Sequence, residues 1–428
     1  MTFSSDHQIK MALLVLGILI LLASRTVVPL WALSLHLRAY LWWFVILIVS
    51  WGQGTCLLGS LFDGVAKNRP EMKTALATGL GLGLLSLEIF LLGLGGLYNT
   101  PAITGLVLLS LVAVMLFLNP SIGSYFPRIR EPDPGARIPL ALVGVAGLMI
   151  LLFALVPPVF FDAMTYHLEL PARYLFEGRV FHVPENLYSG YPQLVEILFG
   201  AGMALDGLAL SGMIALTFLL LTMLLLWGWG KDRFGQEGTA WGIALLVLTP
   251  PYMVIVGFFE NGWAAAFFTL AAIFILADGD RSSRSMMLAG CMAGLATGCK
   301  YNALAFALAG PLVAGVLDDL WEKRGFRPGP WVIFFVFAVI VASPWYVKNL
   351  YFTGDPVYPL LAGLAGEVPG LGILAADTHH HLLKLGDIWA WLLIPYIAVF
   401  RSWELQLWMS PGLLPVALIP TLPSLRGS

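Results

Sequence analysis

Charged side chains are scarce in this chain. Asp, Glu, Lys and Arg together make up 11% of its 428 residues, whereas 59% of the residues are hydrophobic. A soluble domain carries about 25% charged residues, so this composition excludes an ordinary soluble domain. Repeated apolar runs of about 20 residues indicate instead a chain that crosses a membrane several times.

Cysteine is rare, and a strong net charge is absent. Cys56, Cys291 and Cys299 fall in apolar runs without metal-ligand spacing, and we interpret all three as buried thiols. The net charge of −2 says little about partners, because in membrane proteins the placement of charge matters more than its sum. No nucleic-acid motif or basic-aromatic surface is present, so nucleic acid is not an expected partner.

The apolar segments predict an all-α polytopic membrane protein with about 12 transmembrane helices. They lie near residues 11–34, 40–62, 74–97, 101–119, 139–157, 209–230, 238–256, 262–279, 285–300, 302–318, 331–347 and 408–424. The first segment lacks a small-residue cleavage site and continues into more hydrophobic sequence. We therefore expect it to be a retained helix and not a signal peptide.

The basic residues predict an orientation. With the N-terminus in the cytoplasm, most of the 23 Lys and Arg residues fall in cytoplasmic connections. Two long segments, about 158–208 and 348–407, then lie on the outer face. Within them, Tyr191–Gly207 and Asp387–Phe400 are too short to cross the membrane, so we predict amphipathic helices on the outer surface.

Some residues within the predicted membrane helices also carry information. Arg25 and Glu88 should lie at similar depth, and we expect them to form an ion pair because lone charges there are unfavourable. The alternative is that Arg25 extends towards the interface. Gly79, Gly81 and Gly83 lie within one predicted helix, where they favour close helix packing over nucleotide binding.

A dense charged stretch, "PPVFFDAMTYHLELPARYLFEGRV", follows the segment at 139–157. If it is helical, one side carries Asp162, Tyr166, Glu169, Arg173 and Glu177. The opposite side carries Met164, Leu168, Ala172 and Leu175. Such a division predicts a helix lying flat on the membrane, bent or restarted near Pro171. Solvated surface charges are the plain alternative to a functional site, and Asp162 alternatively only caps the helix.

Four stretches in succession resemble landmarks of the GT-C glycosyltransferases. They are "FFDAMTYHLELPARYLFEGRV", "PENLYSGYPQLVEILFGAGMALDG", "GLATGCKYNALAFALAGP" and "SPWYVKNLYFTGDPVYPLL". The nearest group is that of the protein O-mannosyltransferases, aminoarabinose transferases and related bacterial enzymes. The resemblance covers about 139–423 and implies a GT-C-like catalytic core at 139–428. Residues 1–138 then form an N-terminal membrane extension of four helices.

The resemblance implies a reaction and a place for it. Enzymes of this group transfer a sugar from a polyprenyl phosphate to a lipid, glycan or protein acceptor on the outer face of a membrane. For this chain it implies the bacterial inner (plasma) membrane, contact with membrane lipids, and an inverting displacement at the anomeric carbon. Asp162 matches the acidic residue that acts as general base on the acceptor hydroxyl, a role suited to a carboxylate.

Cations are expected near the departing phosphate, because it gains negative charge. Lys300, Lys348 and Arg173 are the candidates for this contact. Lys300 alternatively extends from the end of its helix to the interface. Lys348 and Asn349 alternatively anchor their helix at the interface.

Other polar residues are expected around the substrate. Tyr166 and His167 follow the candidate base, although His167 alternatively only forms hydrogen bonds within its loop. Glu260 lies in the outer turn "FFENGWAA" as a second carboxylate, or as a helix cap together with Asn261. Tyr301 follows the lysine of "GCKYNA" and completes the candidate set.

No cofactor is predicted, and a divalent cation stays an open question. His379–His381 are adjacent and point in different directions, so a polar cluster in the acceptor groove is favoured over a metal site shared with Asp377 and Asp387. Ala163 follows Asp162 where related enzymes often carry a second acid. That difference argues against a two-carboxylate metal site in this loop.

Two other classes of function compete with the transferase. A multi-pass transporter predicts internal repeats and broken helices at mid-membrane depth, whereas no repeat is visible and the polar candidate residues cluster at the predicted outer surface. A non-catalytic lipid-sugar-binding subunit of a glycan assembly system would share the fold with a silent site. Related enzymes usually continue beyond "SPGLLPVALIPTL", so we expect acceptor recognition to be reduced or supplied by a partner.

Overall fold

The computed structural model describes residues 36–66, 68–117, 131–249, 255–278, 281–321, 327–359 and 361. Within these ranges the secondary structure is helical throughout, which confirms the predicted all-α class. The α-helices are α3 (Leu37–Leu61), α4 (Pro70–Leu94), α5 (Thr100–Phe117), α6 (Arg137–Leu155), α7 (Glu169–Glu177), α8 (Leu194–Leu205), α9 (Leu208–Leu248), α11 (Gly262–Ala277), α12 (Ser283–Cys299), α13 (Gly310–Trp321) and α14 (Pro328–Thr353). Short 3₁₀ turns cover Pro134–Ala136, Leu187–Gly190 and Ile255–Phe258, and π-helical turns cover Ala163–His167 and Leu304–Ala309.

The described part of the chain has 6 helices long and apolar enough to cross a membrane. They are α3, α4, α5, α9, α14 and the helix at Pro134–Leu155, which contains α6. α8 and α11 are apolar but shorter. The prediction of a polytopic membrane protein is confirmed, while the predicted spans at 11–34 and 408–424 lie outside the described residues.

α9 is two helices joined at Gly235. This residue has φ 71° and ψ 168°, a conformation open to glycine but not helical. A Cβ atom placed on Gly230 would lie 2.9 Å from the Thr239 side chain. In an unbroken helix, positions nine residues apart are separated by about 13 Å along the axis. The chain therefore folds back at Gly235, as the two predicted segments at 209–230 and 238–256 require.

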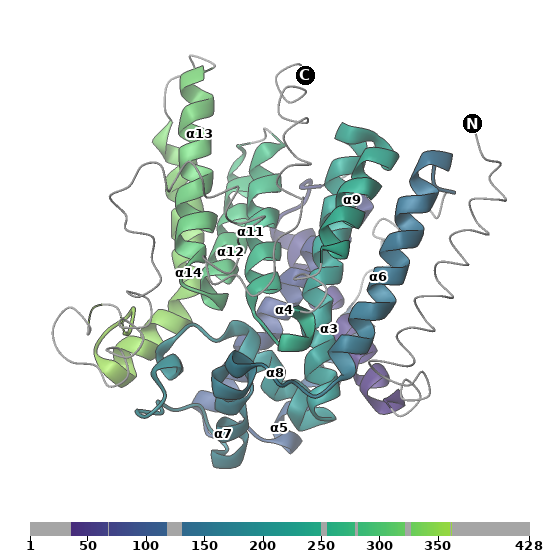
Figure 1. The fold of residues 1–428 in the computed structure, drawn as a ribbon. Coiled ribbons are helices and arrows are strands. Elements are labelled where there is room, and N and C mark those ends of the chain that lie inside the picture. The colour runs from purple at the N-terminus through teal and green to yellow at the C-terminus, as the bar shows by residue number, and fades with distance from the viewer. Residues whose placement is uncertain are drawn as a thin grey trace, which may run out of the picture.

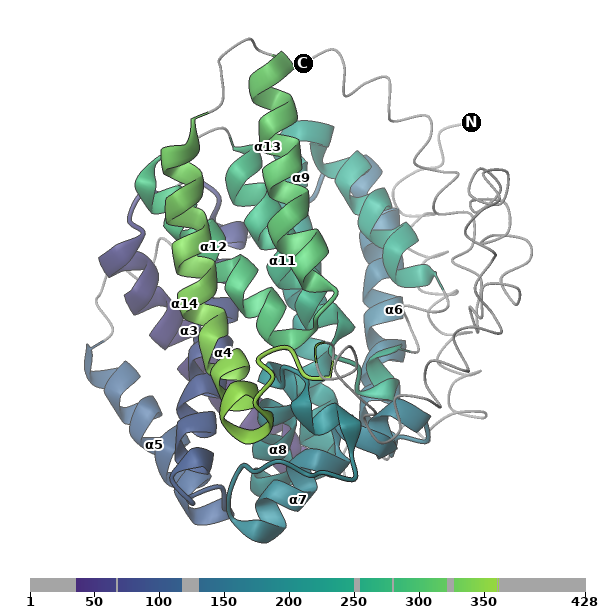
Figure 2. The ribbon, with the colours of Figure 1, turned by 90° about the vertical axis from the view of Figure 1, so that its left-hand side faces the viewer.

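α4 and α9 form the centre of the bundle, and other helices pack around them (Figure 1). α3 packs on α4, α6 packs on α9, and α12 lies between α11 and α14. Figure 2 shows α14 running along the bundle to the level of α8. α5 is only 17% buried over its apolar window, as expected for a helix that faces lipid.

Glycine lets α3 and α4 approach closely. A Cβ atom on Gly81 would lie 1.7 Å from the carbonyl oxygen of Ser50, and one on Gly54 would come equally close to α4. Gly79 and Gly83 face side chains of α11 and α12 at similarly short range. The predicted close-packing role of these glycines is confirmed.

The two ends of the bundle carry different segments of the chain. α7, α8 and the adjoining loops gather at one end, which is the lower end in Figure 1. At the other end, ion pairs connect the segments predicted to be cytoplasmic. Arg69 pairs with Asp232 at 3.1 Å and with Asp278 at 2.8 Å, and Lys231 pairs with Glu71 at 2.6 Å. The segments that the charge pattern assigned to one side of the membrane therefore share one end of the fold.

α8 is a buried helix, so the prediction of a surface helix at Tyr191–Gly207 is wrong. Its 12 residues are too few to cross a membrane, as expected. However, nearly all of them are buried, and the helix packs against α4, α7 and α9. Its surface is apolar on almost every side, and such a helix is stable inside a protein and not on its surface.

The charged stretch also departs from the predicted amphipathic helix. A π-helical turn covers Ala163–His167, and α7 begins only at Glu169, close to the expected restart near Pro171. Tyr166, predicted on the polar side, is 8% exposed, whereas Met164, predicted on the apolar side, is 58% exposed. The wider π-turn rotates the side chains relative to a regular helix, and the predicted stripe is therefore interrupted.

Two predictions about residues within the helices have different outcomes. Cys291 and Cys299 are buried as predicted, but Cys56 is exposed on α3, so the prediction of a buried thiol is wrong there. Glu88 accepts hydrogen bonds from Gln53 Nε2 at 3.0 and 3.1 Å. Arg25 lies outside the described residues, so its pairing with Glu88 stays a prediction.

Candidate active site

A buried histidine joins two carboxylates at the α7–α8 end of the bundle. The His167 side chain is fully buried, its Nδ1 lies 2.7 Å from Glu196 Oε1, and its Nε2 lies 3.7 Å from Glu260 Oε2. Burial lowers the pKa of His167, but the hydrogen bond to Glu196 and the charges of Glu196 and Glu260 outweigh burial and raise the pKa to about 9. The two flanking carboxylates thus favour the protonated imidazole, which carries a donor on each ring nitrogen.

The turn before α11 brings the second carboxylate to this histidine. Phe258 stacks on Phe160 with ring centroids 4.3 Å apart, which holds the turn against the segment that precedes Asp162. Phe259 has φ 54°, a conformation rare for a residue with a side chain. This backbone reversal directs Glu260 towards the cluster.

Asn261 connects three elements. Its Nδ2 donates to Glu196 Oε1 at 2.9 Å and to the carbonyl oxygen of Cys299 at 2.9 Å. Although Asn261 stands at the N-cap position of α11, its side chain makes no capping hydrogen bond. The amide instead ties α8 and the end of α12 to the turn that carries Glu260.

Asp162 and Glu260 are close enough to perturb each other. Burial raises the pKa of Asp162, and the negative charge of Glu260 raises it further, against smaller opposing effects from His167 and Lys300. Burial alone would raise the pKa of Glu260, but the nearby charges of His167 and Lys300 lower it. Two neighbouring carboxyl groups whose pKa values move apart are suited to different protonation roles.

Lys300 is the cation of this cluster that remains open to solvent. It directly follows α12, and its Nζ lies 3.7 Å from Glu260 Oε2. Its side chain is 35% exposed. Lys300 is thus placed both to neutralise Glu260 and to contact a bound anion.

Lys348 and Asn349 are buried in the last turns of α14 and hold the segment before α8. Lys348 Nζ donates to the carbonyl oxygens of Ser189 at 2.9 Å and Tyr191 at 3.0 Å, and to Gln193 Oε1 at 3.4 Å. An ammonium group has three N–H donors, so these acceptors use all of them. In this conformation Lys348 fixes the backbone of the segment at 187–193.

Tyr301 takes part in the same hydrogen-bond network as Asn349. Its hydroxyl lies 2.9 Å from Asn349 Nδ2 and 2.9 Å from the carbonyl oxygen of Tyr358. Asn349 Nδ2 also donates to the carbonyl oxygen of Gly190. Tyr301 and Asn349 therefore hold the loop at Gly190 to the segment that ends at Tyr358.

A row of tyrosines connects the two groups of residues. Tyr166 stacks on Tyr188 with centroids 4.2 Å apart and planes 14° apart. Tyr188 contacts Tyr191 at 5.3 Å, and Tyr191 contacts Tyr301 at 5.4 Å. The predicted residues Tyr166 and Tyr301 thus belong to one aromatic row, which continues from Tyr301 to Tyr346.

Arg173 is separate from both groups. Its guanidinium pairs with Glu169 on α7 and with Glu185 at 2.6 Å, and its side chain is 42% exposed. The structure brings Asp162, His167, Glu260 and Lys300 together, and it leaves Arg173 on the outer side of α7.

Exposed apolar side chains flank Asp162. Val159 is 91% exposed, Phe161 is 70% exposed and Met164 is 58% exposed. Isolated apolar residues are common on protein surfaces, but three within six positions of one carboxylate form an apolar border.

The structure gives no support for a metal centre among the residues it covers. No three His, Cys, Asp or Glu side chains in those ranges are placed to hold an ion. His379–His381, with Asp377 and Asp387, lie outside the described residues. The need for a divalent cation therefore stays open.

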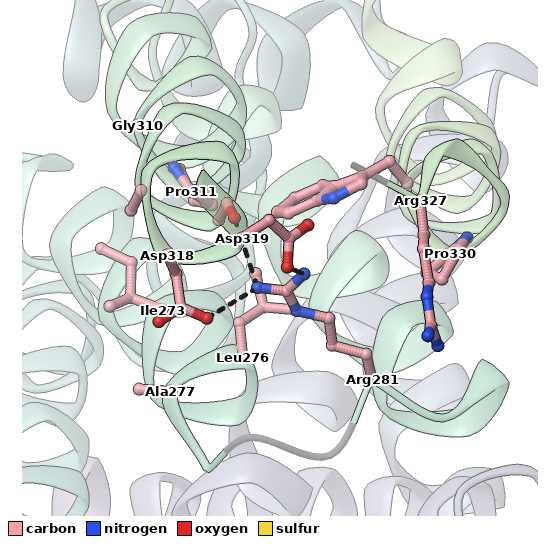
Figure 3. A pocket seen from close by; sticks show the side chains of 13 residues that line it. Ile273, Leu276, Ala277, Arg281, Gly310, Pro311, Asp318, Asp319, Arg327 and Pro330 are labelled. Atoms are coloured by element: carbon pink, nitrogen blue, oxygen red, sulfur yellow. Dashed lines mark hydrogen bonds and ion pairs between the residues drawn. The ribbon is translucent and has the colours of Figure 1, made fainter. Parts of the chain in front are cut away.

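A cavity of about 660 Å³ lies away from this cluster, between α11, α13 and α14 (Figure 3). Arg281 occupies it and donates to Asp319 at 2.7 Å and to Asp318 at 3.1 Å. Arg281 stands just before α12 and Lys300 just after it, and a helix of 17 residues separates its ends by about 25 Å. None of the predicted site residues lines this cavity, so its size does not identify the reaction centre.

Glu196 and Asn261 are the residues of the cluster that the sequence analysis missed as site residues. Glu196 is the one charged residue in the otherwise apolar α8. A lone acid in an apolar segment is a signal of function, and it could have identified Glu196. The role of Asn261 depends on partners in α8 and α12 that no local pattern reveals.

One comparison with known protein families finds a match, over part of the chain. Residues 194–347 match the family described as dolichyl-phosphate-mannose-protein mannosyltransferase. No curated protein and no solved structure matches the chain. The matched range includes Glu196, Glu260 and Lys300 and ends just before Lys348. Together with the apolar helices, this match supports an integral membrane glycosyltransferase of the GT-C superfamily.

Proposed function

We propose that this protein transfers a sugar from a polyprenyl-phosphate donor to an acceptor hydroxyl on the outer face of the bacterial inner (plasma) membrane. The observation that carries the proposal is the cluster in which Asp162, Glu260 and Lys300 meet at one end of a bundle of apolar helices. The family match over 194–347 supports the donor class. The acceptor is a lipid, a glycan or a protein.

Asp162 is the general base of the proposed reaction. The acceptor oxygen attacks the anomeric carbon, the bond from that carbon to the phosphate oxygen breaks, and the acceptor proton passes to Asp162. A single displacement of this kind inverts the configuration at the anomeric carbon. The carboxyl group is half-buried and its pKa is raised, and both properties favour proton uptake over a permanently ionised state.

Cations stabilise the departing polyprenyl phosphate. Lys300 is the first candidate because its ammonium is accessible beside Glu260. Lys348 would have to release one of its three acceptors to reach a phosphate, and Arg173 would have to open its pairs with Glu169 and Glu185. We therefore assign Lys348 first to holding the segment at 187–193.

The remaining candidates shape the site. His167 faces Glu260 and keeps that carboxylate ionised. Tyr166 packs against His167, with ring centroids 4.0 Å apart. Tyr301 and Asn349 fix the loop that borders the site. Residues 1–138 stay a proposed membrane extension of the core at 139–428.

The proposal is tested with purified protein in liposomes that contain a polyprenyl-phosphate sugar labelled in the sugar. A transferase releases free polyprenyl phosphate in step with the appearance of label on an acceptor. A transporter would move the label across the membrane without cleaving the donor, and a silent binding subunit would retain the donor unchanged. The assay uses donors with several different sugars and a membrane extract as the source of acceptors. Either of those two results under these conditions rejects the proposal.

A further inference from the structure

Glu196 has no part in the proposed displacement, yet it is among the most deeply buried acids in the described residues. Its side chain is 2% exposed and lies within the apolar helix α8. Oε1 accepts hydrogen bonds from His167 Nδ1 at 2.7 Å and from Asn261 Nδ2 at 2.9 Å. A carboxylate in such surroundings is retained only where an opposite charge compensates its lost hydration.

The compensating charge is the imidazolium of His167, which lies between two carboxylates. Its Nδ1 is held by Glu196, and its Nε2 points to Glu260 at 3.7 Å. Because one ring nitrogen is fixed from α8, the ring has a single orientation in which the other nitrogen faces the reaction centre. Other titratable or charged groups that interact with this pair are Asp162, Tyr166, Tyr174, Cys299, Lys300 and Lys348.

We propose that Glu196 is a positioning residue that keeps His167 protonated and aimed at Glu260, so that Glu260 stays ionised and Asp162 is left as the proton acceptor. The second half of this inference rests on the proposed function. The first half concerns only the charge and orientation of His167. Glu196 itself touches neither the donor nor the acceptor.

The electrostatic order of the cluster supports this role. His167 and Lys300 both lie 3.7 Å from Glu260 Oε2, and together they lower the pKa of Glu260. The ionised Glu260 in turn raises the pKa of Asp162. By keeping His167 cationic, Glu196 thus moves apart the pKa values of the two adjacent carboxyl groups, Asp162 and Glu260.

The first test is a titration of His167 by nuclear magnetic resonance in the full chain, labelled at histidine. The variant H167Q identifies the signal. We expect His167 to titrate near pH 9 in the wild type and at least one unit lower in E196Q, which preserves the shape of the side chain but removes its charge. The control is E71Q, which removes a partly buried acid paired with Lys231 at the other end of the bundle.

A second variant covers the case in which E196Q does not fold. E196D keeps the charge but withdraws it by about one bond length along the side chain, so His167 should titrate between the wild-type and E196Q values. If E196Q folds and its His167 titrates as in the wild type, the inference is overturned. If E196Q does not fold, a wild-type titration of His167 in E196D overturns it.

The second test is the pH dependence of transfer. Loss of the His167 charge in E196Q acts on Asp162 directly and also through Glu260, which is then easier to protonate, so the acidic limb of the rate profile should shift from its wild-type position. A purely structural role would lower the rate at every pH and leave that limb in place. If the wild type transfers no sugar, the proposed function fails and the histidine titration still decides the role of Glu196. If transfer occurs but His167 is insensitive to E196Q, this inference alone fails.

Discussion

The ammonium of Lys348 donates to the carbonyl oxygen of Tyr191 at 3.0 Å, across 157 positions of the sequence. The same ammonium also holds Ser189 and Gln193. α14 therefore fixes the loop that leads into α8 and, through α8, the position of Glu196. Lys348, predicted at the outer end of a membrane helix, therefore supports the backbone next to the site.

This relationship predicts that two lysine variants lose different properties. K348M leaves buried carbonyl oxygens without a donor and should lower the free energy of unfolding by about 1–3 kcal/mol. K300M removes an accessible ammonium and should leave stability nearly unchanged, while the specificity constant for the donor falls by about 10- to 100-fold. Thermal unfolding and donor-dependent kinetics measure the two effects. A stable K348M with weak donor binding would instead make Lys348 a phosphate ligand.

The charge on His167 predicts how stability depends on pH. The pKa of this histidine is about 9 in the folded protein, compared with an ordinary value of 6.5. The stabilisation that it gives is complete below about pH 6.5 and is lost as the pH rises through about 9. The midpoint of thermal unfolding should therefore fall over that pH range by more in the wild type than in H167Q. Equal slopes for the two proteins would contradict a charged His167.

Packing between α3 and α4 gives a prediction independent of the site. A Cβ atom on Gly81 would lie 1.7 Å from the carbonyl oxygen of Ser50, so G81A must push the two helices apart. We expect a loss of about 1–3 kcal/mol in the free energy of unfolding. G59A on α3 is the matched control, because a Cβ atom there meets nothing within 4 Å. Similar stabilities of the two variants would show that the helices are not in close contact at Gly81.

Hydropathy and glycine spacing predicted most of the bundle. The segments at 40–62, 74–97 and 101–119 correspond to α3, α4 and α5 within a few residues at each end. Such helices satisfy their own backbone groups in an apolar environment, so a local pattern is sufficient to identify them. The location of α8 was predicted wrongly because its length resembles that of a surface helix. Whether such a helix is buried depends on the helices that pack around it.

The site was predictable only in part. Asp162, Glu260 and Lys300 were selected as residues near the outer ends of helices, and the fold brings them together. The contact between His167 and Glu196 joins an irregular turn to α8, and its geometry depends on the π-helical turn at Ala163–His167. Sequence spacing carries no information about such a turn, and the same holds for the acceptors of Lys348.

The most direct test of the account is the rate of sugar transfer by D162N with the donor at saturating concentration. Asn keeps the size of the side chain but cannot accept the acceptor proton, so kcat should fall by about 100- to 10,000-fold. Binding of the polyprenyl-phosphate donor and the midpoint of thermal unfolding should stay close to those of the wild type. A D162N variant that transfers sugar at the wild-type rate would contradict the assignment of Asp162 as the general base.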